Sequence, residues 1–340
     1  MSEASPSLPG MLSPPTPTPV HTRRIGGLWR RLFAALIDTV VVGIAANLLA
    51  LPFFNALSHV GPWGPLIGFC VSFPYFAILN SRIGDGQTLG KSWMNLRVVD
   101  STGEPVSFSL SAWRCVVLMV PFLIDALTMP ATRTPAALQY LVSTISLLGV
   151  ATAYLVVFNR HTRQGLHDLA ANTFVASTDE IGEVKPPPIW IGHWIVLGTG
   201  LAVYLIAVFA GSMFFGEKYT RWSGALDQIE SMDHVYAAGL NDMTWHSFGV
   251  AGSQKILVVQ LHWTGGVDAE AATANQVAQI LLAHLSETEG RDSIRITFER
   301  GYNLGIASAH SLSTFQFTPD EWRRRLQTTQ AASPTASLKK

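Results

Sequence analysis

Five long apolar segments follow one another along the chain as far as residue 215. They cover roughly residues 32–57, 62–80, 112–129, 137–158 and 189–215, and the second and third are the shortest. A helix rises about 1.5 Å per residue, so each segment is long enough to cross a hydrocarbon core of roughly 30 Å. The first segment starts too late and is too long for a cleavable signal peptide. The pattern therefore predicts five membrane-spanning helices.

After residue 215 the pattern changes to that of a soluble fold. Residues 255–263 and 293–299 alternate apolar and polar side chains and are rich in β-branched residues, which is typical of half-buried strands. Residues 302–310 indicate a further strand, and apolar residues between the first two strands recur at helical spacing after a cap at Asp268. We expect a small α+β domain over residues 216–327, with strands in one layer and helices in the other.

Three segments have the composition of linkers or flexible ends. Residues 1–26 are rich in Pro, Ser and Thr and cannot bury enough apolar surface to offset the entropy of ordering, so we expect a disordered arm. Residues 178–188 are expected to be a linker and residues 328–340 a disordered tail. The predicted fold is a mainly α membrane protein: a four-helix transmembrane unit over residues 27–177, a fifth transmembrane helix at 189–215 and the small soluble α+β domain.

The composition supports a membrane location and argues against several functional classes. The chain is 48% hydrophobic and 14% charged, whereas soluble domains contain about 25% charged residues. A formal net charge of zero argues against nucleic acid as a partner. The histidines show no metal-ligand spacing and no G-x-S-x-G nucleophile elbow is present, so we expect no enzymatic activity, no cofactor and no metal. Cys70 and Cys115 lie in or beside apolar runs and are interpreted as packing residues.

Basic residues next to the apolar segments gather on one side of the predicted membrane. On that side lie Arg23, Arg24, Arg30, Arg31, Arg82, Lys91, Arg97, Arg114, Arg160, Arg163 and Lys185, whereas Arg133 is the basic residue of the opposite short loops. Lys and Arg are enriched in cytoplasmic loops. We therefore expect a protein of the cytoplasmic (inner) membrane, with its N-terminus in the cytoplasm and its C-terminal domain on the extracytoplasmic side.

Asp38 lies inside the first apolar segment. A carboxylate there costs about 2.5–3.5 kcal/mol on the insertion scale, while each Leu, Ile, Val or Phe contributes roughly 0.3–0.6 kcal/mol in favour, so the helix still inserts. Arg31 lies seven residues earlier on nearly the same face, with Ala34 and Ala35 between them. Such a stripe of small and charged residues predicts contact with another helix. Two turns separate Arg31 from Asp38, which is too far for a direct pair, so the partner of Asp38 is expected elsewhere in the chain.

Several ordered motifs resemble those of one family of membrane proteins. They are an arginine opening the first helix, an aspartate within it, GQTLGK and LRVVD ahead of a further arginine, and R-x-G-L-H-D-L-x-A-x-T-x-V after the fourth segment. Together they resemble the RDD family over about residues 27–176. The resemblance implies that the arginine and two aspartates that name the family are Arg31, Asp38 and Asp168. It also implies transport, which in some members is associated with sodium/proton exchange.

The spacing and the resemblance together predict one charged cluster. We expect Arg31, Asp38, Arg114 and Asp168 to meet in the cytoplasmic half of the four-helix unit, with Asp38 held by cationic groups from other spans. In one interpretation the cluster is a structural ion-pair network that fixes helix register. In the other, Asp38 is a titratable carboxylate that faces a polar pathway, where burial favours its protonated form and the arginines oppose this.

Lys91, Arg163 and Asp125 are secondary candidates. Residues 84–92, GDGQTLGKS, lack the glycine spacing of a phosphate-binding loop and are interpreted as a turn at the lipid surface, with Lys91 near anionic headgroups. Asp125, near the outer end of the third segment, is interpreted as an interfacial carboxylate, with a role as ion ligand as the alternative.

Two further local patterns carry structural predictions. Residues 96–108, LRVVDSTGEPVSF, predict a β-hairpin around Ser-Thr-Gly. Gly64 and Gly68 form a small-xxx-small pair, which predicts close packing between helices.

Two functional hypotheses follow from the sequence. The first is transport of a small solute or cation, in proton-coupled exchange or without it, through the RDD-like helical unit. The second is a membrane-anchored scaffold or sensor whose outer α+β domain binds a protein or an envelope component. Membrane lipid is a partner in both hypotheses.

Overall fold

The computed structural model describes residues 24–128, 136–180, 182–185, 187–246, 253–284 and 290–331. Most of the arm predicted for residues 1–26 lies outside these residues, as does Arg133. Of the tail predicted to be disordered from residue 328, residues 328–331 form the end of a helix, α10 (Pro319–Ala331), and the remainder lies outside the described residues.

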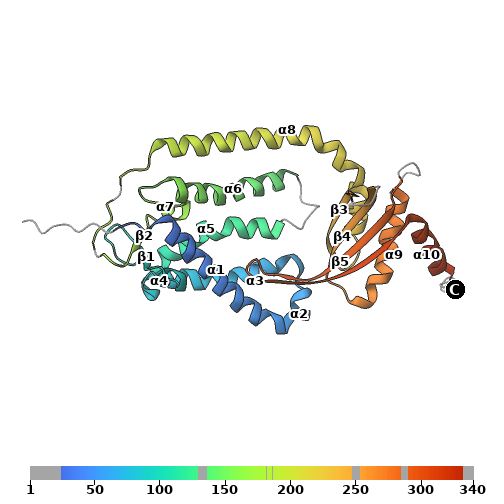
Figure 1. Cartoon of the computed structure of the whole chain (residues 1–340), viewed down its shortest axis with the longest axis horizontal. Helices are drawn as coiled ribbons and strands as arrows, with labels where there is room; N and C mark the ends of the chain where they lie inside the picture. Colours follow the sequence, from blue (N-terminus) through green and yellow to red (C-terminus); the bar gives the residue numbers. More distant parts are fainter. Residues whose placement is uncertain are drawn as a thin grey trace, which may run out of the picture.

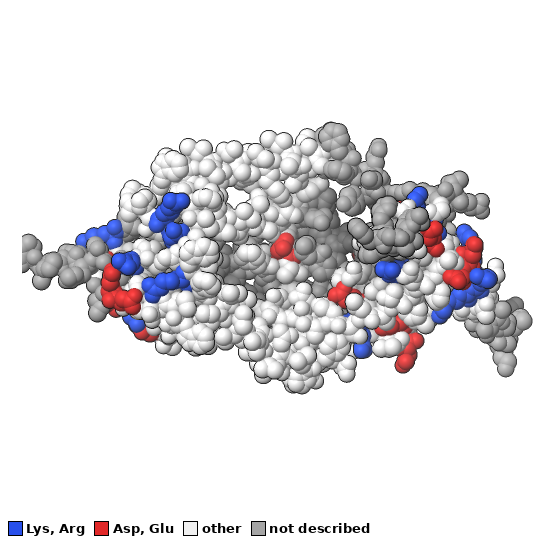
Figure 2. All heavy atoms as spheres, viewed as in Figure 1, with Lys and Arg blue, Asp and Glu red and all other residues white. Residues whose placement is uncertain are grey.

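Five helices of the described chain are long and apolar enough to cross a membrane, as the hydropathy pattern predicts. They are α1 (Leu28–Ala50), α3 (Gly64–Leu79), α5 (Phe108–Thr128), α6 (Ala136–Phe158) and α8 (Ile191–Glu230). Their outward faces carry exposed Leu, Ile, Val, Phe and Trp side chains. On the face that Figure 2 shows, the described Lys, Arg, Asp and Glu residues gather toward the two ends and leave a broad middle band almost free of charge. The protein is a membrane protein with several apolar helices.

Short elements join the helices at the two ends of the bundle. At the end opposite the C-terminal domain lie α4 (Leu89–Trp93), α7 (Leu166–Ala170) and a two-stranded sheet (Figure 1). The turn that connects α3 to this end contains a short 3₁₀ helix, Arg82–Gly84. At the other end α1 continues through Leu51–Phe53 into α2 (Phe54–Ser58), and Gly61–Trp63 leads into α3.

The two-stranded sheet pairs segments that are far apart in sequence. Strand β1 (Leu96–Val99) runs antiparallel to β2 (Phe174–Ser177). The hairpin predicted for residues 96–108 is therefore wrong, although its turn exists, since the Asp100 carboxylate accepts a hydrogen bond from the Thr102 amide at 2.9 Å. The chain enters α5 at Phe108, which leaves too few residues after the turn for a return strand. The pairing instead joins the chain before α5 to the chain after α6.

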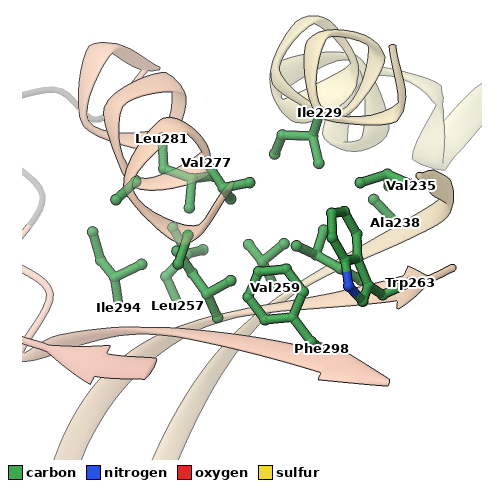
Figure 3. Close-up of a cluster of buried hydrophobic side chains, with 14 of the residues drawn as sticks. Ile229, Val235, Ala238, Leu257, Val259, Trp263, Val277, Leu281, Ile294 and Phe298 are labelled. Carbon is green, nitrogen blue, oxygen red and sulfur yellow. The ribbon is translucent and has the colours of Figure 1, made fainter. Parts of the chain in front are cut away.

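The C-terminal domain is a four-stranded sheet covered on one face by helices. The strands β3 (Val235–His246), β4 (Ser253–Trp263), β5 (Ser293–Asn303) and β6 (Ser308–Phe317) lie in the order β3-β4-β5-β6, with β4 parallel to β5 and the other pairs antiparallel. The helix α9 (Val267–His284) connects the parallel pair. Figure 3 shows side chains of α8 and α9 packed over the sheet around Val259, Trp263 and Phe298. The soluble α+β part expected from the sequence is present.

Three boundaries in this domain differ from those expected. Asp268 lies in the first turn of α9 rather than at its cap. The helix α8 continues without a break to Glu230, beyond the end of the apolar pattern at residue 215. The apolar pattern marks the part of the helix that suits a membrane, and the helix continues past it. Residues 302–310 do not form one strand: they contain the turn between β5 and β6, where Gly305 has a φ of +75°.

This turn, which we call the hairpin tip (residues 302–309), packs against the helical bundle. Strand β5 extends from the sheet toward α3 (Figure 1), and Tyr302, Leu304 and Ala307 form a buried cluster with Ala46 and Ala50 of α1. Burial of these apolar groups ties the C-terminal domain to the helices.

The two glycines of α3 receive this tip. A Cβ added at Gly64 would overlap the carbonyl oxygen of Asn303, and one added at Gly68 would overlap that of Leu304. The close packing predicted from this pair does occur, but the partner is the backbone of the hairpin tip and not another helix.

Candidate functional site

A cavity of about 340 Å³ lies within the part of the bundle nearest β1 and β2. It is bordered by residues of α1, α3, α4, α5, α6 and α7. All four residues of the predicted cluster, Arg31, Asp38, Arg114 and Asp168, are among its lining residues. The structure therefore brings them to one place, although they are not paired as expected.

Asp38 is held by neutral donors. Its carboxylate accepts hydrogen bonds from the Tyr75 hydroxyl at 2.9 Å, the Thr88 hydroxyl at 2.5 Å and the Gly90 amide at 2.8 Å, and the residue is 2% exposed. No arginine or lysine forms an ion pair with it among the described residues. The expectation that cationic groups hold Asp38 is wrong. Three donors around an acceptor-only carboxylate provide the stabilisation that an ion pair was expected to supply.

The local sequence explains how these donors reach Asp38. Thr88 caps the N-terminus of α4 and accepts from the Lys91 amide at 3.4 Å. A Cβ added at Gly90 would overlap the carbonyl oxygen of Ala34, so glycine is what lets α4 lie against α1. The GQTLGK stretch thus places a hydroxyl and a backbone amide within hydrogen-bonding distance of Asp38.

Asp168 is the carboxylate that the arginines hold. Arg114 donates to it from Nε and Nη2, each at 2.7 Å, and Nη2 of Arg31 lies 3.6 Å from its second oxygen. The side chains are 6%, 8% and 1% exposed for Arg114, Arg31 and Asp168. Burial would raise the pKa of Asp168, but the charges of Arg114 and Arg31 hold it below its usual range. The strongly paired carboxylate of the site lies on α7, outside the spanning helices.

Arg163 orders the chain that leads to Asp168. Its side chain donates to the carbonyls of Val156 at 3.1 Å and Val157 at 3.2 Å, near the end of α6. Its own carbonyl accepts from Nη1 of Arg31. Arg163 is not among the residues that line the cavity, so its role there is to position the backbone that Arg31 binds.

Lys91 lies inside the bundle and not at the lipid surface, which corrects the prediction for residues 84–92. Its ammonium lines the cavity and donates to the Asn80 side chain at 2.7 Å. Leu89 and Trp93 occupy the exposed face of α4, so Lys91 falls on the inner face. Burial, together with the charge of Arg114, lowers the pKa of Lys91 to about 8.

His167 also lines the cavity, and sequence reasoning did not select it. Its Nε2 lies 3.4 Å from the Asp168 carboxylate, and burial lowers its pKa to about 3 despite this neighbour. The sequence could have identified His167, because it is the residue before Asp168 in the LHDL motif. Tyr75 was also missed, and no local spacing links it to Asp38.

Asp125 lies away from the cavity. Its carboxylate accepts from the Ser146 hydroxyl of α6 at 3.0 Å. Eleven residues separate it from Arg114 on α5, which corresponds to about 16 Å along the helix. The described residues contain no group of His, Cys, Asp and Glu that could hold a metal ion.

Comparison with known protein families relates part of this chain to one of them. Residues 25–172 match the RDD family. Searches of curated proteins and of solved structures returned no match. The matched range includes Arg31, Asp38, Lys91, Arg114 and Asp168, and it ends before β2, α8 and the C-terminal domain.

Proposed function

Because residues 25–172 of this chain match the RDD family of membrane proteins, we propose that they form a transport unit that binds a small solute at the charged cavity. The transport unit comprises the four helices α1, α3, α5 and α6 with α4 and α7. The single observation that carries the proposal is the cavity itself, lined by ionisable groups from α1, α4, α5 and α7.

The energetic cost of this arrangement supports a functional reading. Burying ionised groups costs several kcal/mol per ion, and apolar side chains of similar volume fix helix packing at lower cost. Ionisable residues within membrane bundles accordingly mark solute and ion pathways. Arg31, Arg114 and Asp168 are each more than nine-tenths buried yet border a space that can hold a ligand.

The orientation is part of the proposal. Following the basic residues of the short loops, we place the β1–β2 end in the cytoplasm of a cell with an inner membrane, and the C-terminal domain outside. The cavity then lies in the cytoplasmic half of the bundle. The proposal includes transport of a small solute and transport of a cation, each with or without proton exchange.

A flux assay tests the transport proposal. The full chain is reconstituted in vesicles and challenged with a solute panel and with sodium, potassium and lithium, while a dye reports internal pH. Asp38→Asn should abolish the flux, because the variant weakens the hydrogen bonds that join α4 to α1 beside the cavity. Asp125→Asn is the matched control, because it removes a carboxylate of the same bundle that does not line the cavity. Absence of flux over the whole panel for the unmodified protein would exclude the proposal.

A sensor or scaffold is the second candidate, and the hairpin tip favours it. The tip connects the C-terminal domain to α1 and α3, so a partner bound to that domain could alter the helices. Site-specific crosslinking of the full chain in native membranes would identify such a partner. If a variant that undocks the hairpin tip leaves both the crosslinked partners and the phenotype unchanged, this candidate is removed.

A further inference from the structure

The hydrogen-bonding capacity around the cavity is unevenly used. Both carboxylates have their oxygens occupied: Asp38 by three neutral donors, and Asp168 by Arg114 with a further bond from the Gly165 amide at 3.3 Å. The acceptors of the site are therefore largely taken up by the protein itself.

The donors are not. Within the described chain, Nε and Nη2 of Arg31 have no hydrogen-bond partner, although the side chain is only 8% exposed and lines the cavity. Its Nη2 is close enough to Asp168 for an ion pair but not for a hydrogen bond, at 3.6 Å. A buried guanidinium with unmet donors is costly, and an acceptor that meets them binds with a corresponding gain.

Lys91 also has spare capacity to donate hydrogen bonds. Its ammonium meets the neutral oxygens of Asn80 at 2.7 Å and Thr88 at 3.5 Å, and no carboxylate pairs with it among the described residues. An ammonium carries three donors, so capacity remains. Around the cavity, Arg31, Lys91 and Arg114 provide three cationic groups against the two carboxylates Asp38 and Asp168, one positive charge in excess.

We propose that the cavity binds the anionic group of its ligand, a carboxylate or a phosphate, between Arg31 and Lys91. Among the described lining residues the oxygens of both carboxylates already accept hydrogen bonds, and the charge in excess is positive, so the cavity suits an anionic group better than a bare cation. The inference narrows the solute class of the proposed function, and only the role of the anion in transport rests on that function. Binding itself stands on the donors alone.

The remaining lining indicates the rest of the ligand. Leu32, Phe76, Leu118, Met119 and Val156 give the cavity an apolar wall. A volume of about 340 Å³ corresponds to a body on the order of ten non-hydrogen atoms, taking roughly 30 Å³ for each water-sized group. A short apolar body with one anionic group fits, and so does the headgroup of an anionic lipid. A small organic acid and an anionic lipid present the same anionic group to the cavity. They differ in that the apolar part of the lipid extends out of the cavity into the membrane.

Binding to the purified full chain in an uncharged detergent tests the inference. The probes are phenylacetate, its neutral isostere phenylacetamide and the cation phenethylammonium, measured by calorimetry and by the shift in thermal unfolding temperature. Phenylacetate should bind and stabilise, and the amide and the amine should bind at least tenfold more weakly. Arg31→Gln and Lys91→Gln should each weaken phenylacetate at least tenfold, with Arg31→Lys as the milder variant if Arg31→Gln does not fold. Arg97→Gln is the matched control, since Arg97 pairs with Asp85 and does not line the cavity.

A second arm separates the two sources. The protein is placed in nanodiscs of phosphatidylcholine alone or with phosphatidylglycerol. Competition between phosphatidylglycerol and phenylacetate assigns the site to a lipid headgroup, and undiminished phenylacetate binding assigns it to a free acid; both support an anionic ligand.

Two outcomes overturn the inference. One is equal or tighter binding of phenethylammonium, and the other is no binding of phenylacetate in detergent together with no effect of phosphatidylglycerol. These results are distinct from failure of the transport proposal. Anion binding without flux would refute the transport proposal and support the anion site. Sodium flux without anion binding would support transport and refute the anion site.

Discussion

Replacing Gly68 by alanine should release the hairpin tip from the bundle. The added Cβ would lie 2.8 Å from the carbonyl carbon of Leu304 and overlap its oxygen. Backbone atoms cannot rotate away as a side chain can, so the tip or α3 must move. We expect the C-terminal domain to stay folded, because its core cluster around Val259 includes none of the residues of the hairpin tip.

The magnitude can be worked from the buried groups. Tyr302 and Leu304 are 2% and 6% exposed, and burial of a large apolar side chain contributes about 1.5–3 kcal/mol, so docking is worth at most roughly 3–6 kcal/mol. Inserting a methyl group into a packed contact costs about 1–3 kcal/mol. The undocked population of the Gly68→Ala variant should therefore rise about 5- to 150-fold.

Cysteine labelling measures this population. Ala307 is 6% exposed at the tip, and Ala307→Cys in a background lacking Cys70 and Cys115 should react with a maleimide only when the tip is undocked. The labelling rate should increase by the same factor as the undocked population. Gly198→Ala on α8 is the matched control, since nothing lies within 4 Å of the added Cβ. An unchanged rate in Gly68→Ala, or an equal increase in Gly198→Ala, would refute the reasoning.

Three further predictions concern the charged site. Gly90→Ala should destabilise the protein by about 1–3 kcal/mol, measured as a lower unfolding temperature, because the Cβ would overlap the carbonyl of Ala34. The His167 imidazole has a pKa of about 3 when folded against 6.5 when exposed, so the unfolded state binds more protons between these values. Stability should therefore fall as pH decreases from 6.5 toward 3, by up to about 1.4 kcal/mol per pH unit, and His167→Gln should flatten the profile of unfolding temperature against pH. The ammonium of Lys91, with a pKa of about 8, should lose its proton as pH rises through that value, so phenylacetate affinity should fall severalfold between pH 7 and pH 9.

Each of these predictions has its own control. Gly27→Ala adds a Cβ that meets nothing within 4 Å and should leave the unfolding temperature unchanged. His59→Gln removes an exposed histidine and should leave the pH profile as it was. Lys91→Arg keeps the charge above pH 8 and should give an affinity independent of pH up to 9. Acid stability that is the same with and without His167, or anion affinity that rises with pH, would contradict the assignments.

The spanning helices could be predicted from the sequence because the signal for them is local. A run of apolar residues such as 32–57 needs no knowledge of its neighbours to be assigned to a membrane. The strands at 255–263 and 293–299 carry a period-two pattern and were predicted for the same reason. No strand was predicted at β3. Residues 302–310 were assigned to one strand, because a hairpin whose tip packs on helices keeps apolar residues through its turn.

The residues of the site could be predicted, but their pairing could not. Arg31, Asp38, Arg114 and Asp168 do border one cavity, yet the arginines hold Asp168 rather than Asp38. The partners of Asp38 include a backbone amide at Gly90, and a backbone donor leaves no trace in residue type. Arg114 meets Asp168, which lies 54 residues further along the chain, and no local spacing indicates a contact of that range.

The spacing of these contacts has a consequence for synthesis in the cell. The Asp38 carboxylate accepts hydrogen bonds from Thr88 and Gly90, which lie 50 and 52 residues further along the chain. The Arg163 carbonyl that accepts from Arg31 lies 132 residues further along. At about 5–20 residues per second, synthesis of Arg163 follows that of Arg31 by on the order of ten seconds. During that interval the nascent helix carries an arginine and a carboxylate without their final contacts. The contact between Arg31 and the Arg163 carbonyl therefore forms only after α6 has been synthesised.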